Sequence, residues 1–373
     1  MKWLYILLMM SAFLLSVWLN SGCSKKTPLD PPSPRNPREY VWQLDTLTIP
    51  GVFQNTMSDI WASSAKNVYV AGHSSNGPGL IFSFDGQKWA SARISIAEGG
   101  PISGTLSLRA IYGFGPDDIW AVGSRAFRNP NPPPNFIDTS LVIHFNGNQW
   151  REVHDPVLRV GGFLRAVWGN SAMDLWTSDL WGKLFHFNGT LWQEKDVPVS
   201  IPKDITFQKN FHLNAITGRS ANEIYLLGWA NVQNPIQDSY YFLGLESGKW
   251  TIQDSAIIKP GLFEIKWGTN EIWYSPWGKL YSVGPRGTFE WTGSSWINIH
   301  RTEAPLTDIH GTSEDNLFTV GHFGNIWHYN GKDWQQFLEL KFREVANTGV
   351  WTVDNEAFVI GSNGSVTLAL HGK

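Results

Sequence analysis

The chain has 373 residues and a formal net charge of −3, and only 16% of its residues are charged. It has no basic excess and no long Lys/Arg run, so binding to nucleic acid has no electrostatic support. Aromatic residues make up 14% of the chain. Many of these aromatic residues recur at fixed positions of a repeat, so we assign them first to packing between the repeated units.

An apolar run from Trp3 to Leu19 follows Lys2 and ends shortly before Cys23, the only cysteine. The run is too short and wrongly flanked for a permanent membrane span, so residues 1–22 are predicted to be a signal peptide. The segment resembles a bacterial lipoprotein leader, and this resemblance implies that Cys23 is lipidated. An ordinary secretory signal is the alternative. Residues 23–39 are rich in proline, which predicts an extended tether between lipid and domain.

Short strand-like runs bounded by Gly, Asn, Asp or Pro begin after the tether and repeat along the chain. The clearest copy spans 109–150, with Ile119-Trp120-Ala121-Val122-Gly123 as its second strand. An Asn-Gly pair at Asn146-Gly147 predicts a type I′ hairpin turn before Trp150. One copy therefore predicts a four-stranded antiparallel meander. Related copies start near Asp59, Ala166, Ala215, Glu271, Asp308 and Gly349.

A period of about 40 to 55 residues with four strands in each copy is typical of a β-propeller. We therefore expect an all-β fold in which residues 40–373 form one propeller domain. Seven blades fit the copies best, with six or eight as alternatives. The last copy lacks a fourth strand, and Val41–Leu44 matches the missing outer strand. The amino-terminal strand should therefore close the last blade and protect its edge.

The longest insertions all fall between strands two and three or between blades, which places them on one face. They are 90–108, 125–139, 195–213 and 230–239. Insertions gathered on one face of a repeat protein commonly mark its binding face. Neutral drift of loop length is the alternative.

The repeat also predicts a ring of polar residues where each inner strand begins, at the channel mouth on this face. Arginine binds carboxylates in a bidentate manner, so a ligand with an anionic or sugar-like group is expected; the alternative is that these residues only solvate the mouth. The ring is Ser58, Arg109, Arg165, Asn214, Asn270, Thr307 and Thr348. The candidate ligand-binding residues are Arg109, Arg165, Asn214 and Asn270 from the ring, with Asp179, Trp229 and His322 from the ends of second strands.

His144, His186 and His328 occupy one equivalent repeat position. Equivalence puts them on different blades, too far apart to share an ion, so a structural role is expected. No motif for zinc, calcium or a phosphate-binding loop is present in the sequence. No metal and no cofactor are therefore predicted.

The Ile119–Gly123 and Asn146–Trp150 segments resemble repeats of bacterial envelope propeller lipoproteins. These families are distantly similar to sialidase-type Asp-box propellers and photosystem II assembly factor propellers. The Asp box has one residue between Asp and Gly, whereas Asp85-Gly86 has none. No sialidase active site is therefore carried over, and no catalytic residue is assigned.

The expected function is that of a non-catalytic binding or scaffold module, tethered to an envelope membrane, that holds a protein, peptide or glycan on the long-loop face. The Ser24 that follows the cysteine resembles lipoproteins sent to an outer membrane, which implies that location, and a monomer is expected. One alternative is a glycan-active hydrolase or lyase, which needs two facing carboxylates. The candidate carboxylates are Asp179, Glu264, Glu271 and Asp308. Another alternative is a purely structural lipoprotein.

Overall fold

The computed structural model describes residues 35–52, 54–74, 80–132, 135–159, 162–199, 211–233, 236–258 and 265–373. The predicted signal peptide, Cys23 and residues 24–34 of the predicted tether lie outside these ranges. The strands all belong to the unit Asn36–Lys373. Within the described ranges, no helix is long and apolar enough to cross a membrane.

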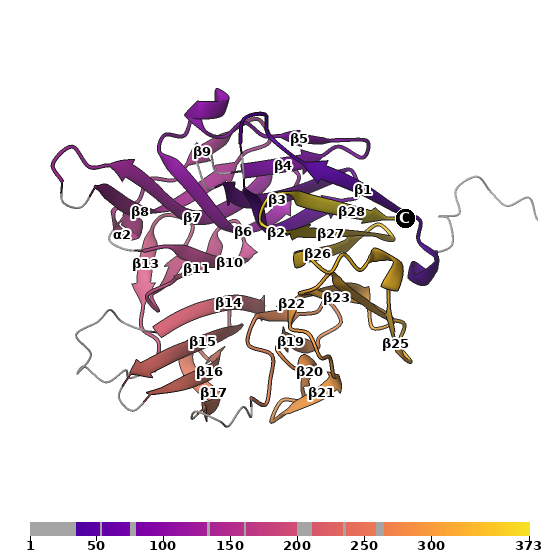
Figure 1. The fold of residues 1–373 in the computed structure, drawn as a ribbon. Coiled ribbons are helices and arrows are strands. Elements are labelled where there is room, and N and C mark those ends of the chain that lie inside the picture. Colours follow the sequence, from indigo (N-terminus) through magenta and orange to yellow (C-terminus); the bar gives the residue numbers. More distant parts are fainter. Residues whose placement is uncertain are drawn as a thin grey trace, which may run out of the picture. The chain divides into compact units, whose positions relative to one another are not determined.

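The described part of the chain forms antiparallel sheets arranged around a central space: five separate four-stranded sheets and one eight-stranded sheet (Figure 1). The eight-stranded sheet contains β2 (Asn55–Ser64), β3 (Asn67–Ser74), β4 (Leu80–Phe84), β5 (Trp89–Ser91), β6 (Thr105–Gly115), β7 (Asp118–Arg128), β8 (Phe136–Phe145) and β9 (Trp150–Glu152). Two sheets follow: β10 (Leu164–Ser171), β11 (Asp174–Asp179), β12 (Leu184–Phe187) and β13 (Trp192–Lys195); then β14 (Phe211–Ser220), β15 (Glu223–Gln233), β16 (Ile236–Glu246) and β17 (Lys249–Ile258).

The chain continues around the ring with three more sheets. They are β18 (Glu271–Tyr274), β19 (Leu280–Gly284), β20 (Gly287–Trp291) and β21 (Trp296–His300); β22 (Leu306–Ser313), β23 (Asn316–Gly321), β24 (Asn325–Tyr329) and β25 (Trp334–Gln336); and β26 (Ala346–Val353), β27 (Glu356–Ser362) and β28 (Thr367–Gly372) with β1 (Trp42–Leu47). Short helical turns are η1 (Pro37–Glu39), η2 (Ile96–Glu98), α2 (Pro156–Arg159) and η3 (Leu338–Leu340).

The fold is therefore an all-β propeller with four-stranded antiparallel blades, but seven separate four-stranded sheets are not observed. The described part contains five, because β3 pairs with β6 through His73 and Ser107. This pairing merges the β2–β5 and β6–β9 meanders into the eight-stranded sheet. The blade count therefore depends on how that sheet is divided.

The amino-terminal strand closes the ring as expected. β1 pairs antiparallel with β28, from Trp42 opposite Gly372 to Leu47 opposite Thr367. On the other side of the junction, the Thr348 hydroxyl donates a 2.8 Å hydrogen bond to the Met57 carbonyl. Both ends of the domain are thus held in one closed body, and the edge of β28 is covered.

In five outer strands, the opening tryptophan packs on the aromatic residue that ends the preceding strand. This contact recurs in five sheet segments with nearly constant geometry, so the repeated aromatic residues have a packing role. The ring centroids are 5.2 Å apart for Phe84–Trp89, 5.3 Å for Phe145–Trp150, Phe187–Trp192 and Trp291–Trp296, and 5.1 Å for Tyr329–Trp334.

The Asn-Gly turns differ from the predicted two-residue type. β8 ends at Phe145 and β9 pairs with it from Trp150, so the loop has four residues, and only Gly147 has a positive φ (83°). The Asn146 side-chain oxygen accepts hydrogen bonds from the backbone N–H groups of Asn148 and Gln149 at 3.2 and 3.1 Å. Asparagine is therefore selected here by this side-chain cap rather than by a left-handed backbone.

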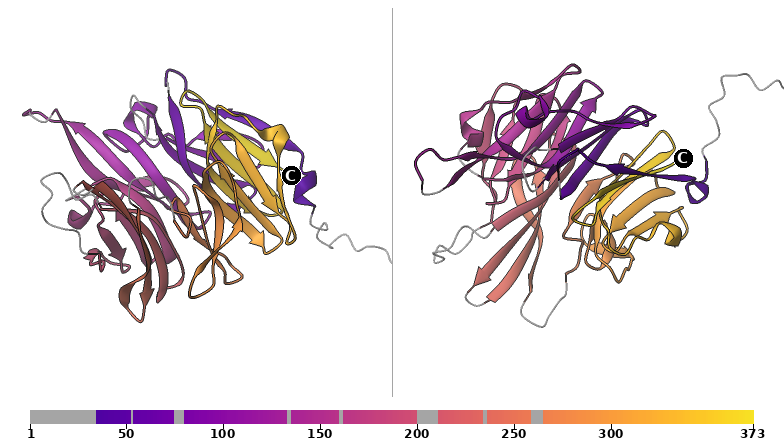
Figure 2. Two further views of the ribbon diagram at one scale, coloured as in Figure 1. Left: turned by 60° about the horizontal axis from the view of Figure 1, so that its bottom comes forward. Right: turned by 45° about the horizontal axis from the view of Figure 1, so that its top comes forward.

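The predicted insertion at 125–139 is largely a continuation of the sheet. β7 and β8 stay paired as far as Arg128 opposite Phe136. Figure 2 shows this hairpin projecting beyond the neighbouring strands. The side chains of Phe136 and Ile137 are exposed near its tip. A paired hairpin is a more rigid extension of the face than a free loop.

Candidate functional site: the central channel

The inner strands carry a β-bulge at the position of the predicted polar ring. Six inner strands shift register against the second strand by skipping one residue at this position, whereas β18 pairs with β19 without a shift. A bulge leaves its extra residue unpaired and redirects the side chain. The skipped residues are Ser58, Arg109, Arg165, Asn214, Thr307 and Thr348.

A glycine lies opposite the bulge on several second strands, and the bulge requires it. A Cβ atom on Gly123 would lie 2.0 Å from the Ser107 carbonyl oxygen, and one on Gly321 would lie 2.2 Å from the Pro305 oxygen. Real Cβ atoms do not approach backbone this closely. The repeated glycine therefore marks a close backbone approach, and the strand pair that displays the ring side chain depends on it.

A cavity of about 370 Å³ occupies the centre of the ring. Asn270 and Thr307 do not line it. The Asn270 amide donates a 2.7 Å hydrogen bond to the Leu306 carbonyl, and the Thr307 hydroxyl donates one of 2.7 Å to the Asn347 carbonyl. These two residues therefore join neighbouring inner strands. The residues of the predicted ring that do line the cavity are Ser58, Arg109, Arg165, Asn214 and Thr348.

The basic side of the channel consists of Arg109 on β6 and Arg165 on β10. Both side chains are exposed at the mouth, and neither makes a hydrogen bond or an ion pair within the described residues. Desolvation in the mouth lowers the pKa of Arg109, and the charge of Arg165 lowers it further. The two guanidinium groups are therefore close enough to repel each other, and an anion between them would relieve that repulsion.

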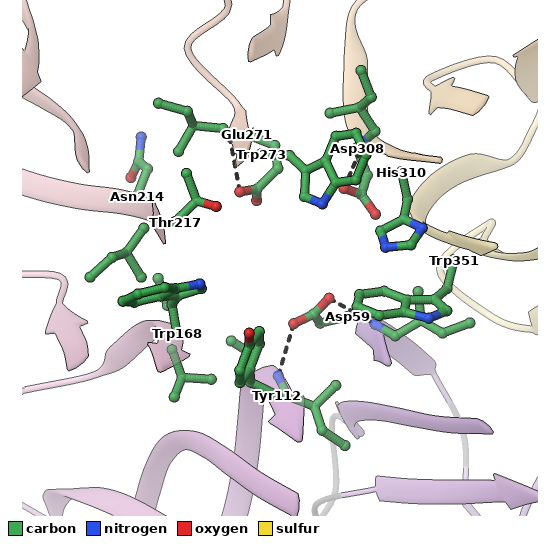
Figure 3. Close-up of a pocket in the computed structure, with 18 of the residues that line it drawn as sticks. Asp59, Tyr112, Trp168, Asn214, Thr217, Glu271, Trp273, Asp308, His310 and Trp351 are labelled. Carbon is green, nitrogen blue, oxygen red and sulfur yellow. Dashed lines mark hydrogen bonds between the residues drawn. The ribbon is translucent and has the colours of Figure 1, made fainter. Parts of the chain in front are cut away.

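The acidic side consists of Asp59 on β2, Glu271 on β18 and Asp308 on β22, which project toward the centre of the cavity (Figure 3). Asp59 accepts hydrogen bonds from the backbone N–H groups of Ile60 and Ile111, both at 2.8 Å.

Asp308 on β22 repeats this arrangement. It accepts from Ile309 and Val350, both at 2.7 Å. Asp59 and Asp308 thus each join their own inner strand to the next one. Within the described ranges, Glu271 accepts only from the backbone N–H of its neighbour Ile272, at 3.0 Å.

The acidic side carries a mutual repulsion that its hydrogen bonds only partly offset. Burial raises the pKa of Asp59 from 3.8 to about 6. Burial also raises the pKa of Glu271 and of Asp308 well above their usual values. The charge of Asp308 raises the pKa of Glu271 further, and that of Asp59 raises the pKa of Asp308. Clustered groups with perturbed pKa in a cavity are typical of functional sites.

Aromatic rings fill the wall between these charges: Tyr112, Trp168, Trp273 and Trp351 surround the centre in Figure 3. His310 stacks on Trp351 with centroids 3.9 Å apart. The His310 Nδ1 atom accepts a 3.1 Å hydrogen bond from the Thr352 N–H, and burial lowers the pKa of this histidine to about 3. The imidazole is therefore neutral and belongs to the aromatic wall.

Three candidate residues from the ends of second strands lie outside this cavity lining. Asp179 is fully buried, and its carboxylate accepts from the N–H groups of Trp181 and Lys183 at 2.9 and 2.8 Å. It pairs opposite Leu164, which is the position that glycine holds in most other blades, so the sequence register was one residue off. Trp229 stacks on His212 at 4.4 Å, and His322 is exposed beyond β23. Glu264 is outside the described residues.

Asp59 and the aromatic wall were missed by sequence reasoning as site residues. Each occupies a fixed offset from the bulged residue: one position on for Asp59, Glu271 and Asp308, and three positions on for Tyr112, Trp168, Trp273, His310 and Trp351. Alternate residues of an inner strand face the channel, and this alternation would have predicted the second set.

The repeat-equivalent histidines are structural, as expected. His144 contacts Asp118 and His186 contacts Asp174, each at 2.7 Å, and both rings stack on a tryptophan, at 4.3 Å on Trp120 and 4.2 Å on Trp176. His328 contacts Asn316 at 3.2 Å. Within the ranges that the structure covers, no group of three His, Cys, Asp or Glu side chains is placed to hold a metal ion.

The fold and the channel define the class: a β-propeller with a charged, aromatic-walled central cavity. No family model and no curated protein matches the chain. Solved structures do match in fold. "YCF48 bound to D1 peptide" has a TM-score of 0.57 at 14% identity, covering 90% of this chain and 97% of that one. YCF48 from Cyanidioschyzon merolae has a TM-score of 0.53 at 12% identity, covering 87% and 98%.

A third match is the extracellular domain of the putative hybrid two component system BT4673 from B. thetaiotaomicron. Its TM-score is 0.55 at 11% identity, and the match covers 88% of this chain and 40% of that one. At these identities the likeness establishes the β-propeller fold alone.

Proposed function

We propose that this protein is a non-catalytic binding module whose channel mouth holds a charged segment of a peptide or protein partner. One observation carries the proposal. Two arginines without partners in the described residues and three carboxylates with raised pKa line the same cavity. A ligand bearing both charges would relieve the repulsion on both sides.

A peptide supplies that chemistry better than a neutral glycan. Its carboxylate suits Arg109 and Arg165, because guanidinium binds carboxylates through paired hydrogen bonds. A lysine side chain or amino terminus suits the acidic side, where aromatic faces such as Trp273 and Trp351 add cation–π attraction. The peptide bound by the similar YCF48 propeller supports this choice of partner class. A glycan remains the second choice.

The test is a peptide array that presents lysine-containing peptides with free and amidated carboxyl termini. Retention should favour free termini, and an Arg109→Ala/Arg165→Ala double variant should lose at least about tenfold in affinity for each hit. Lys332→Ala, which removes an exposed cation on a tight turn far along the chain, is the matched control. Equal retention by wild type and double variant would refute the proposal.

The location of the module is a second part of the proposal. Lipidation of Cys23, after removal of residues 1–22, would tether the propeller as a monomer to an envelope membrane, with the outer membrane favoured by Ser24. Metabolic labelling with a radioactive fatty acid should mark the wild-type chain and leave Cys23→Ala unlabelled. Label on the variant would remove the anchor from the proposal.

We also infer that the eight-stranded sheet acts as two blades, which gives seven in total. Both halves are complete four-stranded meanders, and the link between them is the pair His73–Ser107. An experimental structure of the domain should show the pairing between β3 and β6 confined to this one pair. Further paired residues between β3 and β6 would instead favour a continuous sheet.

One observation favours a glycan-active hydrolase as the second candidate. Glu271 and Asp308 line the cavity together, and the charge of Asp308 raises the pKa of Glu271. A carboxyl group with a raised pKa is what a general acid needs. Assays of envelope polysaccharide hydrolysis with wild type and Glu271→Gln distinguish the two functions. Turnover by the wild type that Glu271→Gln abolishes would replace the binding proposal.

A further inference from the structure

A second cavity lies on the long-loop side of the sheet formed by β22–β25, and it shares no lining residue with the channel. Its volume is about 630 Å³. It is bounded by the links that follow β21, β23 and β25. Its lining includes Arg301, Phe323, Trp327, Gln336, Lys341 and Arg343.

The cavity is basic. Arg301, Lys341 and Arg343 come from two different links, and none of them forms an ion pair within the described residues. Glu303 is the acidic residue among the lining residues. Three cations against one carboxylate leave a net positive site, which favours an anionic ligand and supplies hydrogen-bond donors to it.

The turn that follows β23 presents an aromatic ring at the rim in a disfavoured conformation. Phe323 and Gly324 have φ of 59° and 66°, and the Asn325 N–H donates to the His322 carbonyl at 3.3 Å. Positive φ at both central residues is the pattern of a type I′ turn, which selects Asn or Gly rather than a bulky residue. Phe323 is nevertheless there, and its side chain is 56% exposed. A strained, exposed aromatic residue points to a function.

This turn is fixed against the link that carries two of the cations. The Gly324 N–H donates a 2.7 Å hydrogen bond to the Val345 carbonyl. A Cβ atom on Gly324 would lie 2.5 Å from the Phe342 backbone nitrogen, so the two segments touch at this point. Phe323 is therefore held beside Lys341 and Arg343 in a set arrangement rather than on a free loop.

The remaining wall offers a second aromatic face and oriented polar groups. Trp327 is partly exposed, and the His300 ring packs against it with centroids 4.6 Å apart. The Gln336 amide donates to the Asn325 side-chain oxygen, and the Asn325 amide donates to the His322 carbonyl at 2.6 Å. The carbonyl oxygen of Gln336 is then left to accept from a ligand hydroxyl.

From this combination we propose that the cavity binds an acidic sugar, that is, a pyranose ring bearing a carboxylate. The cations hold the carboxylate, the faces of Phe323 and Trp327 hold the apolar side of the ring, and Gln336 and Glu303 accept its hydroxyl groups. The site is independent of the channel and of the peptide proposed there.

Isothermal titration calorimetry of the full chain with an oligogalacturonate, and with its fully methyl-esterified form, tests the charge requirement. The two probes share their rings and hydroxyl groups and differ in the carboxylate. We expect the acid to bind at least about tenfold more tightly than the ester. No binding of the acid, or equal binding of both forms, would overturn the proposal.

Variants test the residues. Arg343→Ala should weaken the acid by about tenfold and leave the ester unaffected. Phe323→Asn separates binding from folding, because Asn suits the left-handed backbone better than Phe. It should unfold at the same or a higher temperature and yet bind the acid about tenfold more weakly. Lys332→Ala should match the wild type. Unchanged affinity in Phe323→Asn would show that the exposed ring has no part in binding.

Discussion

The basic side and the acidic side of the channel differ in how their charged side chains are bonded to the rest of the ring. Arg109 and Arg165 project from bulges and make no bond within the described residues, so they contribute charge to the mouth and little else. Asp59 and Asp308 sit one residue further on and accept backbone N–H groups from two inner strands. The basic side is therefore available for a ligand, whereas the acidic side also holds the ring together.

Both sides of the channel depend on strand pairs in which a glycine lies opposite the bulge. Substitutions of these glycines should have the largest effect on stability. Gly123→Ala and Gly321→Ala would each place a Cβ atom about 2 Å from a backbone oxygen. We expect each to lower the free energy of unfolding by about 3 kcal/mol, since backbone must move. Urea denaturation measures this. Gly115→Ala, where the nearest atom is 3.4 Å away, is the control. Unequal losses of unfolding free energy in the two variants would show that the β6–β7 and β22–β23 strand pairs are built differently.

Asp308→Ala should have the next largest effect. It leaves the N–H groups of Ile309 and Val350 without their acceptor. We expect a loss of about 2 kcal/mol in the free energy of unfolding, reduced by whatever water in the channel replaces. Asp308→Asn retains one acceptor oxygen and should lose less. A variant as stable as the wild type would mean that this carboxylate does not hold the ring.

The repulsion on the acidic side predicts a pH-dependent difference. Because the folded protein raises the pKa of Glu271, it binds more protons than the unfolded chain above pH 4.5, and ionisation costs stability as the pH rises. Glu271→Gln cannot ionise and keeps an oxygen for the Ile272 N–H. Its advantage over the wild type should therefore be smallest near pH 4 and grow as the pH rises to 7.

The measurement is urea denaturation of both proteins at several pH values. Buried histidines such as His310, whose pKa is lowered to about 3, titrate in the same range with the opposite sign. Their effect cancels in the difference between variant and wild type. A constant difference across this range would mean that neither burial nor the charge of Asp308 raises the pKa of Glu271.

The smallest effect on stability is expected on the basic side. Arg109→Ala removes a side chain without partners in the described residues and relieves its repulsion with Arg165. The free energy of unfolding should change by less than about 0.5 kcal/mol, while binding of a carboxylate-bearing peptide falls. A loss of stability as large as that of Asp308→Ala would make the two sides equivalent.

The sequence alone determined the strands, the meanders and the closure by β1, because each depends on local alternation, turn residues and a missing outer strand. Five of the seven predicted ring residues line the central cavity, since a repeat register transfers between blades; they are Ser58, Arg109, Arg165, Asn214 and Thr348. The predicted register of Asp179 was one residue off, because the second strand β11 has Asp179 at the position where most other second strands have glycine.

Only the tertiary structure decided which residues from distant parts of the sequence lie close together. Asp59 and Asp308 are 249 positions apart in the numbering, and their charges interact because ring closure brings the first and sixth copies near each other. The pairing of His73 with Ser107 depends on how far two meanders rotate, which no local pattern encodes. The distances across a ring follow from how all its sheets pack together, so they emerge only when the ring is closed.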